Sequence, residues 1–242
     1  MHKNRPISVN ATRAADEARF ESCCFCLELL DGYSDDVVMR FGRPVRRLMW
    51  ESEDFVVAPT LGQLAFGHLL VIPKVHTTSM CQIQESRLAQ AERAISEVER
   101  SVAFELGDFV SFEHGMQNGG SGGCGIDHAH LHIVPIDRRI KTMPRVANDW
   151  TQLSRVGWLE ETRTRVDSDY LYLRGQDGTR YVTPVEEVPS QFMRIWLSSQ
   201  TDNPLWDWRE YGFEPNLLRT LSWMSDVAPP RGYFRFPARV GQ

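Results

Sequence analysis

The sequence predicts an α+β fold with a mainly antiparallel sheet, and two observations carry this prediction. Short apolar segments bounded by turn signals predict strands at 55–58, 68–72, 109–112 and 128–134. One long amphipathic pattern lies between the second and the third of these segments. Strands arranged around a single long helix are typical of an α+β domain.

The long helix is predicted over about 84–106. Its apolar residues recur at a spacing of three or four positions, with charged residues between them: Leu88, Ala91, Ile95, Val98, Val102 and Leu106. This spacing is the period of an α-helix that buries one face.

Composition divides the chain into three parts. Residues 1–20 are polar and weakly patterned, which predicts a flexible N-terminal arm. The strand and helix patterns above place a first domain at 21–140, and 141–242 holds six of the seven tryptophans. We expect this last part to be an α+β C-terminal extension that packs on the core of the first domain.

Within the extension, the segment 170–182 predicts a hairpin with a Gly/Asp turn. Helices are predicted at 190–197 and 217–224, with Pro204 and Pro215 as interruptions.

Charge and hydropathy exclude several classes of protein. The 242 residues carry 32 acidic and 27 basic side chains, for a net charge of -5, and a duplex-binding surface needs clustered Lys and Arg instead. No apolar run approaches the ~18–20 residues that span a bilayer. The N-terminus lacks the apolar core of a signal peptide. We therefore expect a cytoplasmic protein without a membrane partner, and nucleic-acid binding is disfavoured.

The five cysteines do not form the pattern of a disulfide framework, because their number is odd and three of them lie within four residues. Cys23 and Cys26 form a C-x-x-C pair, which leaves metal binding, redox chemistry or core packing as alternatives. Cys24 and Cys81 are expected in the core.

His128, His130 and His132 are the strongest local signal for chemistry. Alternate residues of a strand share a face, so the three imidazoles would lie together. The residues between them would point into the core: Ala129, Leu131 and Ile133. A coincidental polar face and a metal site are alternatives. Catalysis is favoured, because a histidine can act as a nucleophile or a proton donor near neutral pH.

Three motifs, in order along residues 23–135, resemble the histidine triad (HIT) superfamily of nucleotidyl hydrolases and transferases. They are the alternating histidines, the segment Gly67-His68-Leu69-Leu70-Val71-Ile72-Pro73-Lys74-Val75-His76, and Cys23-x-Phe25-Cys26. The resemblance implies that 21–140 is a HIT domain, with a five-stranded antiparallel sheet, one long helix and one or more short helices. It also implies a homodimer.

The resemblance assigns roles to five residues. His130 would attack the α-phosphorus of a nucleotide and form a nucleotidyl-histidine intermediate. His132 would hydrogen-bond the phosphoryl oxygens or the leaving group. His128 and His68 would hold the tautomer and the geometry of the nucleophile. Gln117 stands where the dinucleoside-polyphosphate hydrolases have a catalytic glutamine.

The glycine-rich segment before the histidines is a candidate phosphate cradle, although such segments are often plain connectors. Its backbone N–H groups at Gly122 and Gly123 would face phosphate oxygens. Two positions depart from the family pattern: Thr60 replaces the usual ribose-binding Asp or Asn, and Gly125 replaces a Ser or Thr. Ser121 is a candidate substitute for the latter. The departures favour phosphoryl chemistry over a specificity for adenosine.

The resemblance also implies a zinc site. In zinc-bearing relatives, two N-terminal cysteines join two histidines, which here would be Cys23, Cys26, His76 and His128. Two thiolates and two imidazoles suit tetrahedral Zn²⁺. The alternative is a pair of buried cysteines without a ligand. With zinc bound, His128 would be a structural ligand.

The expected function is hydrolysis of a phosphoanhydride or phosphoramidate bond at the α-phosphate of a nucleotide. A dinucleoside polyphosphate is the first expected substrate and a nucleoside phosphoramidate the second. A nucleotidyltransferase or phosphorylase with the same intermediate, and a non-catalytic nucleotide-binding module, are the alternatives.

The segment 190–209 weakly resembles the tail of splicing-associated CwfJ-like HIT proteins, which adds an RNA-processing scaffold as a further alternative. In this segment Arg194 and Arg209 could reach an anionic substrate, and the tryptophans could stack on a base. Helices that simply pack on the sheet are the favoured interpretation, because tryptophan mostly marks buried area.

Overall fold

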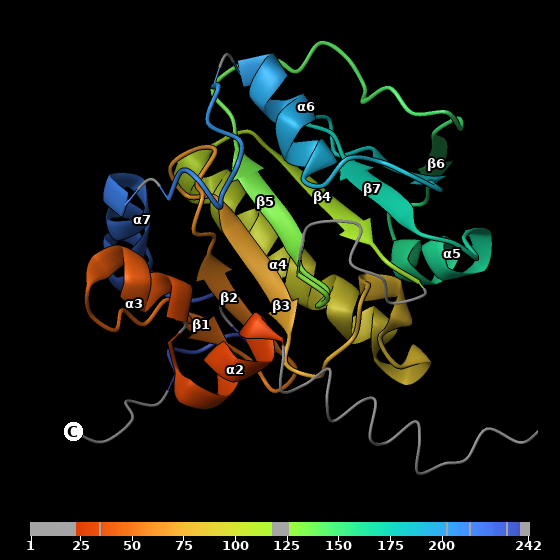
Figure 1. Ribbon diagram of the computed structural model, residues 1–242. Coiled ribbons are helices and arrows are strands. Elements are labelled where there is room, and N and C mark those ends of the chain that lie inside the picture. The colour runs from red at the N-terminus through yellow and green to blue at the C-terminus, as the bar shows by residue number, and fades with distance from the viewer. Residues whose placement is uncertain are drawn as a thin grey trace, which may run out of the picture.

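The centre of the protein is one antiparallel sheet of eight strands. The computed structural model describes residues 23–33, 35–117, 126–201, 203–212, 214–230 and 232–237. The strand order is β1-β2-β3-β5-β4-β7-β8-β6 (Figure 1). The expected N-terminal arm and the glycine-rich segment with Ser121, Gly122 and Gly123 lie outside the described residues.

Five strands come from the first domain and three from the extension. The first five are β1 (Trp50–Glu51), β2 (Phe55–Pro59), β3 (Leu69–Pro73), β4 (Phe109–Gly115) and β5 (Leu131–Pro135). The extension adds β6 (Thr151–Leu153), β7 (Tyr170–Arg174) and β8 (Arg180–Pro184). The predicted hairpin is therefore confirmed, and its strands continue the sheet of the first domain.

Six α-helices and two short 3-10 turns are described around this sheet. They are α2 (Cys24–Asp31), α3 (Asp35–Phe41), η1 (Met80–Gln82), η2 (Glu85–Arg87), α4 (Leu88–Leu106), α5 (Trp158–Arg165), α6 (Phe192–Thr201) and α7 (Glu214–Asp226). The long helix begins four residues later than predicted. Pro215 does not interrupt α7, because it lies in the first turn, where the missing N–H has no intrahelical partner anyway.

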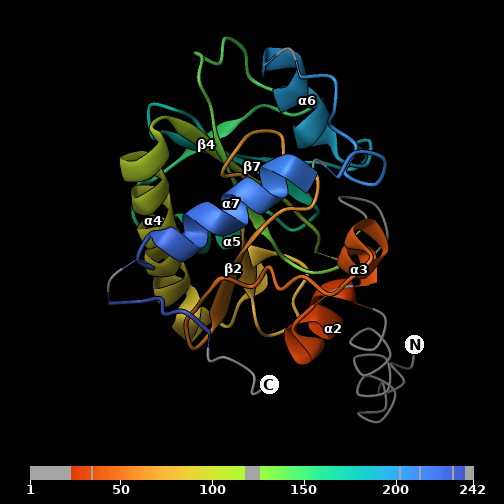
Figure 2. The same cartoon turned by 90° about the vertical axis from the view of Figure 1, so that its left-hand side faces the viewer.

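The two faces of the sheet are covered differently. One face packs on α4 and α5 and forms the largest apolar core. On the other face, α2 covers β2 and β3, whereas α6 covers β4 and β7. Figure 2 shows α4 on one side of the molecule and α2, α3 and α6 on the other. The part of the sheet between α2 and α6 carries the histidines.

The prediction of a strand over 128–134 was wrong in its first residues. β5 begins at Leu131, and His128 and His130 precede it. This approach to the strand is held by a hydrogen bond of 2.6 Å from Ala129 N to Thr77 O instead of a ladder. Within β5 the predicted alternation holds, because Leu131 packs toward α4 while His132 takes the opposite face.

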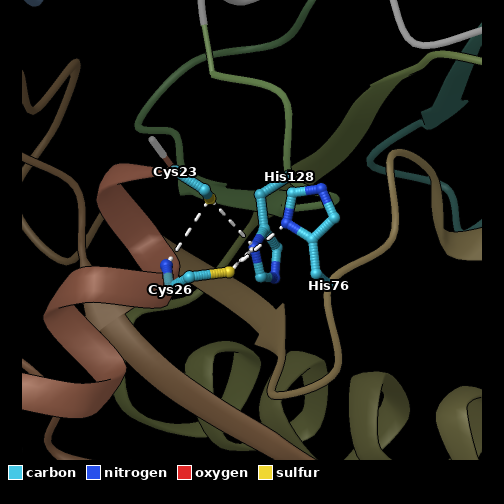
Figure 3. Close-up of side chains that lie close together, drawn as sticks. All are labelled: Cys23, Cys26, His76 and His128. Atoms are coloured by element: carbon cyan, nitrogen blue, oxygen red, sulfur yellow. Dashed lines mark hydrogen bonds between the residues drawn. The ribbon is translucent and has the colours of Figure 1, made fainter. Parts of the chain in front are cut away.

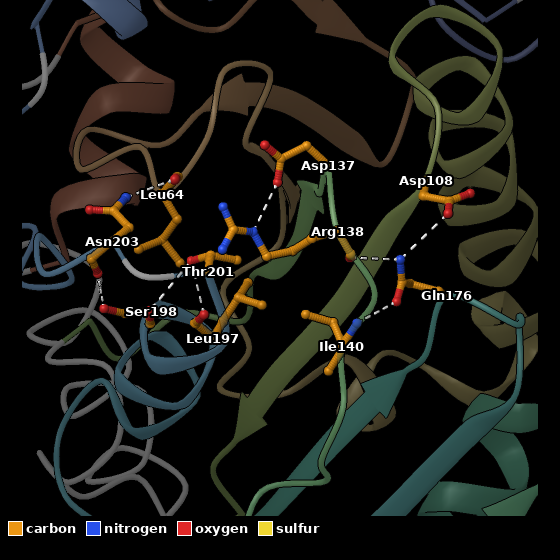
Figure 4. A network of polar contacts seen from close by, with 10 residues as sticks. All are labelled: Leu64, Asp108, Asp137, Arg138, Ile140, Gln176, Leu197, Ser198, Thr201 and Asn203. Atoms are coloured by element: carbon orange, nitrogen blue, oxygen red, sulfur yellow. Dashed lines mark hydrogen bonds and ion pairs between the residues drawn. The ribbon is translucent and has the colours of Figure 1, made fainter.

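The extension is joined to the first domain by main-chain pairing and by polar contacts. β7 pairs with β4 from Ser111–Arg174 to Gly115–Tyr170. A Cβ at Gly115 would lie 2.2 Å from the ring of Tyr170, so only glycine fits beneath that ring. In the network of Figure 4, Asn203 Nδ2 donates to Leu64 O over 2.9 Å. The extension is thus built into the fold.

Glu113 is a buried acid at the centre of β4, and it ties three elements together. Its Oε1 accepts from Met80 N of η1, and its Oε2 accepts from the Tyr170 hydroxyl of β7, each over 2.7 Å. Burial raises the pKa of Glu113 to about 7, although both hydrogen bonds act against this rise.

Within the described residues, no helix is both long enough and apolar enough to cross a bilayer.

The raised pKa makes Glu113 a source of pH-dependent stability. The folded state favours the protonated acid, so its contribution is present below the ordinary carboxyl pKa and is lost as the pH rises through about 7. A pKa shift of this size corresponds to a decrease of about 3 kcal/mol in the free energy of unfolding. Buried histidines act in the opposite direction, so the difference between wild type and Glu113→Gln isolates this carboxyl. Urea denaturation between pH 4.5 and 8 should show the free energy of unfolding of wild type falling relative to that of Glu113→Gln as the pH rises. A difference that does not change with pH would contradict this expectation.

Candidate active site

Three histidines meet on the open part of the sheet between α2 and α6. His68 precedes β3, His130 precedes β5, and His132 lies within β5; all three are buried. Phe112 stacks on His132 with ring centroids 4.5 Å apart. Phe25 of α2 places its ring edge against His130 at 5.4 Å. The rings are therefore fixed by aromatic packing on two sides.

Burial keeps these imidazoles neutral at pH 7. Desolvation lowers the pKa of His128 and of His130 to about 4. It lowers the pKa of His68 and of His132 well below the usual range. A neutral imidazole has one N–H donor and one acceptor nitrogen, so the partners of each ring decide which nitrogen carries the proton.

His68 and His132 form a chain of hydrogen bonds that has a single direction. Leu64 N donates to His68 Nδ1 over 3.2 Å, which places the proton of His68 on Nε2. His68 Nε2 lies 2.9 Å from His132 Nδ1, so His68 donates to His132. The proton of His132 is therefore on its Nε2, which remains available as a donor.

His130 has the opposite tautomer. Its Nδ1 lies 2.6 Å from the carbonyl oxygen of His128, and a carbonyl oxygen can only accept. The proton of His130 is therefore on Nδ1, and its Nε2 carries a lone pair. An unprotonated nitrogen held in a fixed ring orientation is what a nucleophile at a phosphorus centre requires.

A pocket opens beside His130 and His132. Its lining combines the first domain with the extension: Cys24, Phe25, Glu28, Arg47, Thr60, Leu61, Leu70, Ile126, His130, His132, Gln191, Arg194 and Trp208. Thr60, which stands at the ribose-binding position of the family pattern, belongs to this lining. Sequence patterns did not single out Glu28 and Arg47, which form a buried ion pair. They are separated by 19 positions and belong to no motif.

Gln117 lies two residues after the end of β4, and its side chain contacts Cys81 and Gln82. Its amide nitrogen donates to Cys81 Sγ over 3.1 Å, and Gln82 donates to its Oε1 over 3.0 Å. It is not one of the pocket-lining residues in the part of the chain that the structure describes. A catalytic role for Gln117 stays a prediction.

Cys23, Cys26, His76 and His128 meet next to these histidines (Figure 3). Their ligand atoms all lie within 4.8 Å of one another. Cys26 Sγ lies 3.3 Å from His76 Nδ1, and Cys23 Sγ lies 3.4 Å from His128 Nδ1. The structure thus brings together all four residues that the sequence suggested as metal ligands.

The donor set fits a tetrahedral metal ion. A zinc ion with bonds of about 2.0–2.3 Å spaces its ligand atoms roughly 3.3–3.8 Å apart. The contacts from Cys26 Sγ to His76 Nδ1, at 3.3 Å, and from Cys23 Sγ to His128 Nδ1, at 3.4 Å, lie in this range. His128 Nε2 lies 2.8 Å from Pro73 O and donates to it, so the lone pair of Nδ1 faces the cluster. Burial and then the neighbouring Cys23 raise the pKa of Cys26 to about 12, which makes deprotonation of the thiol unfavourable. A bound cation would favour the thiolate and offset this effect.

The comparison with known proteins agrees with the family resemblance of the sequence motifs. The family model described as the HIT domain matches residues 46–139. An uncharacterized HIT-like protein of Chlamydia trachomatis is 32% identical over 89 residues, which cover 36% of this chain and 77% of that protein. The chain belongs to the HIT family. Protein hit of Bacillus subtilis is 26% identical over 87 residues, but the match spans only 59% of that protein and 36% of this chain.

Solved HIT structures are also similar to parts of the chain. A HIT family hydrolase from Clostridium thermocellum is 24% identical with a TM-score of 0.34, covering 51% of this chain and 98% of that chain. A zinc-bound histidine triad family protein from Mycobacterium smegmatis is 21% identical with a TM-score of 0.33, covering 54% and 86%.

The site of this HIT protein extends beyond the segment that the family model matches. That segment contains every histidine described above. Cys23 and Cys26 precede it, whereas Gln191, Arg194 and Trp208 follow it. The preceding part of the chain therefore completes the metal-ligand cluster, whereas the pocket draws on both flanking parts, since Cys24, Phe25 and Glu28 also line it.

The tautomers can be measured directly. In protein with ring-¹⁵N-labelled histidine at pH 7, we expect His68 and His132 as neutral Nε2–H forms and His130 as a neutral Nδ1–H form, because of the partners described above. Long-range ¹H–¹⁵N correlation spectra distinguish these forms, with assignments from single His→Gln variants. A doubly protonated ring, or an Nε2–H tautomer at His130, would contradict the assignment.

Proposed function

We propose that this HIT protein is a nucleotidyl hydrolase whose nucleophile is His130 Nε2. The hydrogen bond between His130 Nδ1 and His128 O carries the proposal, because it leaves Nε2 unprotonated. The family membership supports nucleotide chemistry as the setting. The pocket beside the ring supplies a place for a nucleotide.

In the proposed reaction, the lone pair of His130 Nε2 attacks the α-phosphorus. A P–N bond forms, and the bond from phosphorus to the leaving group breaks with its electron pair; a phosphate leaves as an anion, whereas an amine takes up a proton from solvent as it leaves. His132 Nε2–H donates a hydrogen bond to the phosphoryl group and disperses its developing charge. Water then attacks phosphorus, loses a proton to solvent, and releases the nucleoside monophosphate and the free imidazole.

Thr60 supports nucleotide binding through its place in the pocket lining. Phosphate binding by Ser121, Gly122 and Gly123, and homodimer formation, stay predictions. The acceptor of the nucleotidyl group distinguishes the proposed hydrolase from a transferase or phosphorylase.

Removal of the nucleophile is the direct test. With dinucleoside polyphosphates and adenylated amines as substrates, wild type should release a nucleoside monophosphate. His130→Ala should be slower by at least about 1,000-fold, the scale on which loss of a covalent nucleophile acts. Chromatography of the products measures both, and thermal denaturation checks that the variant is folded. Addition of inorganic phosphate should leave the product unchanged; a nucleoside diphosphate would instead show a phosphorylase.

Turnover by His130→Ala at the rate of wild type would contradict the proposed mechanism. Binding of nucleotides without turnover by wild type would favour a non-catalytic binding module.

We further propose that Cys23, Cys26, His76 and His128 hold a structural zinc ion. The donor set and its spacing support this assignment. When bound, the ion would join α2 to the segment that carries His130. The pairing of His128 Nε2 with Pro73 O orients the ring for this role.

Wild type should contain one zinc ion per chain, and the double variant Cys23→Ser/Cys26→Ser should contain none. If the structural ion contributes about 3–5 kcal/mol to the free energy of unfolding, its loss should lower Tm by roughly 10 °C in a chain of this size. Elemental analysis and calorimetry measure the two effects. Cys24→Ser is the matched control, because it removes a neighbouring thiol outside the cluster and should retain the metal. Zinc retained by the double variant would refute the assignment.

A further inference from the structure

The pocket beside His130 is closed on one side by the C-terminal extension. Gln191, Arg194 and Trp208 line it together with His130 and His132. These three residues follow the segment that the HIT family model matches, so they are features of this chain rather than of the matched domain.

Arg194 is held rigidly in this wall. Its side chain is only 3% exposed. Its Nε donates to Trp206 O over 2.7 Å, and its Nη2 donates to Gly62 O over 2.6 Å. A Cβ at Gly62 would lie 2.5 Å from the Cα of Trp208, so this close approach requires glycine. The guanidinium therefore has one position relative to the loop that precedes His68.

Gln191 fixes the same wall from a second direction. Its φ of 61° is the one positive φ at a non-glycine residue in the described part of the chain. Its Nε2 donates to Asp207 Oδ1 over 2.8 Å, and its Oε1 accepts from Trp208 N over 3.2 Å. Sparsely populated backbone conformations of this kind cluster at ligand sites, where the surrounding structure holds them in place.

The charges of the lining favour an anionic ligand. The histidines are neutral and offer only dipolar groups to a phosphate. Among the lining residues that the structure describes, Glu28 is the one carboxylate, and it is paired with Arg47. Arg194 adds a second guanidinium, so two basic side chains stand against one acidic side chain in this described lining. Asp207 is not one of the described lining residues; it accepts from Gln191 Nε2 and from the backbone N–H of Arg209, and the charges of Arg209 and Arg194 both act on it.

We propose that Arg194 is a substrate-binding residue, and that its guanidinium holds the phosphoryl group of the nucleotide while that group reacts at His130. The inference rests on the proposed nucleotide chemistry and identifies the group that binds the anion. A guanidinium donates charge-assisted hydrogen bonds to phosphate oxygens, which are stronger than those of neutral donors. Burial is the main reason that the pKa of His68, of His130 and of His132 is lowered, and the charge of Arg194 lowers each of them further, as expected of a nearby cation.

The test compares a charged ligand with its uncharged counterpart. Calorimetry would measure the binding of the four nucleoside 5′-monophosphates and of the four nucleosides to wild type, Arg194→Met and Arg194→Lys. Arg194→Met should weaken monophosphate binding about 10- to 100-fold, the effect of losing one charge-assisted contact. Nucleoside binding should change by less than about threefold. Arg194→Lys should recover only part of the loss, since it keeps the charge but not the planar set of guanidinium donors.

Arg40→Met is the matched control. Arg40 Nη2 donates to Trp208 O over 2.6 Å and to Arg209 O over 3.1 Å, so it clamps the same segment from α3 without lining the pocket. Its loss should change monophosphate and nucleoside binding by the same small factor. If Arg194→Met does not fold, Arg194→Lys alone decides, through a monophosphate preference that falls while nucleoside binding is kept.

Equal losses for monophosphates and nucleosides in Arg194→Met would show a merely structural wall and overturn the inference. Unchanged monophosphate binding would overturn it as well. In either case, monophosphate release that depends on His130 would leave the proposed function standing. If wild type neither binds monophosphates nor turns over nucleotides, the proposed function fails and the inference fails with it.

Discussion

The site depends on one constraint, which is that its imidazoles are buried and therefore neutral. A neutral ring has one proton, and fixed neighbours decide where that proton is. The carbonyl oxygen of His128 assigns the proton of His130 to Nδ1, and the N–H of Leu64 sets the direction of the chain through His68 to His132. Backbone groups thus determine which nitrogen attacks and which donates. The sheet and the two helices that flank it serve to hold those backbone groups in place.

Much of this arrangement could be predicted from the sequence, because it is local. The alternation around His132 and the long helix each follow from spacing within a short segment. The metal-ligand residues lie up to 105 positions apart, and the resemblance to the HIT family, rather than local spacing, implied them. The short helix α2 was not predicted, since its few residues are dominated by the Cys23 to Cys26 motif. The strand before Leu131 was predicted too long, because residue types do not show where ladder pairing gives way to single contacts.

The pocket wall could not be predicted, because it is set by tertiary contacts between distant segments. Gln191 and Arg194 lie more than 120 residues after Gly62, and only the close approach of two backbones brings them together. Tryptophan in this region was interpreted as packing, and Trp196 does pack on the sheet. Trp208 instead lines the pocket. Pattern alone does not separate these two uses of the same residue type.

The pairing of β7 with β4 also has a consequence for the order in which the chain folds during synthesis. The ribosome completes β4 at Gly115 and every histidine of the site by His132, yet β7 begins only at Tyr170. Until then one edge of β4 has unpaired N–H and C=O groups, the kind of edge that invites pairing with other chains. The extension therefore protects that edge of β4 by pairing with it. The nascent protein is most prone to aggregate in the interval before β7 is synthesised.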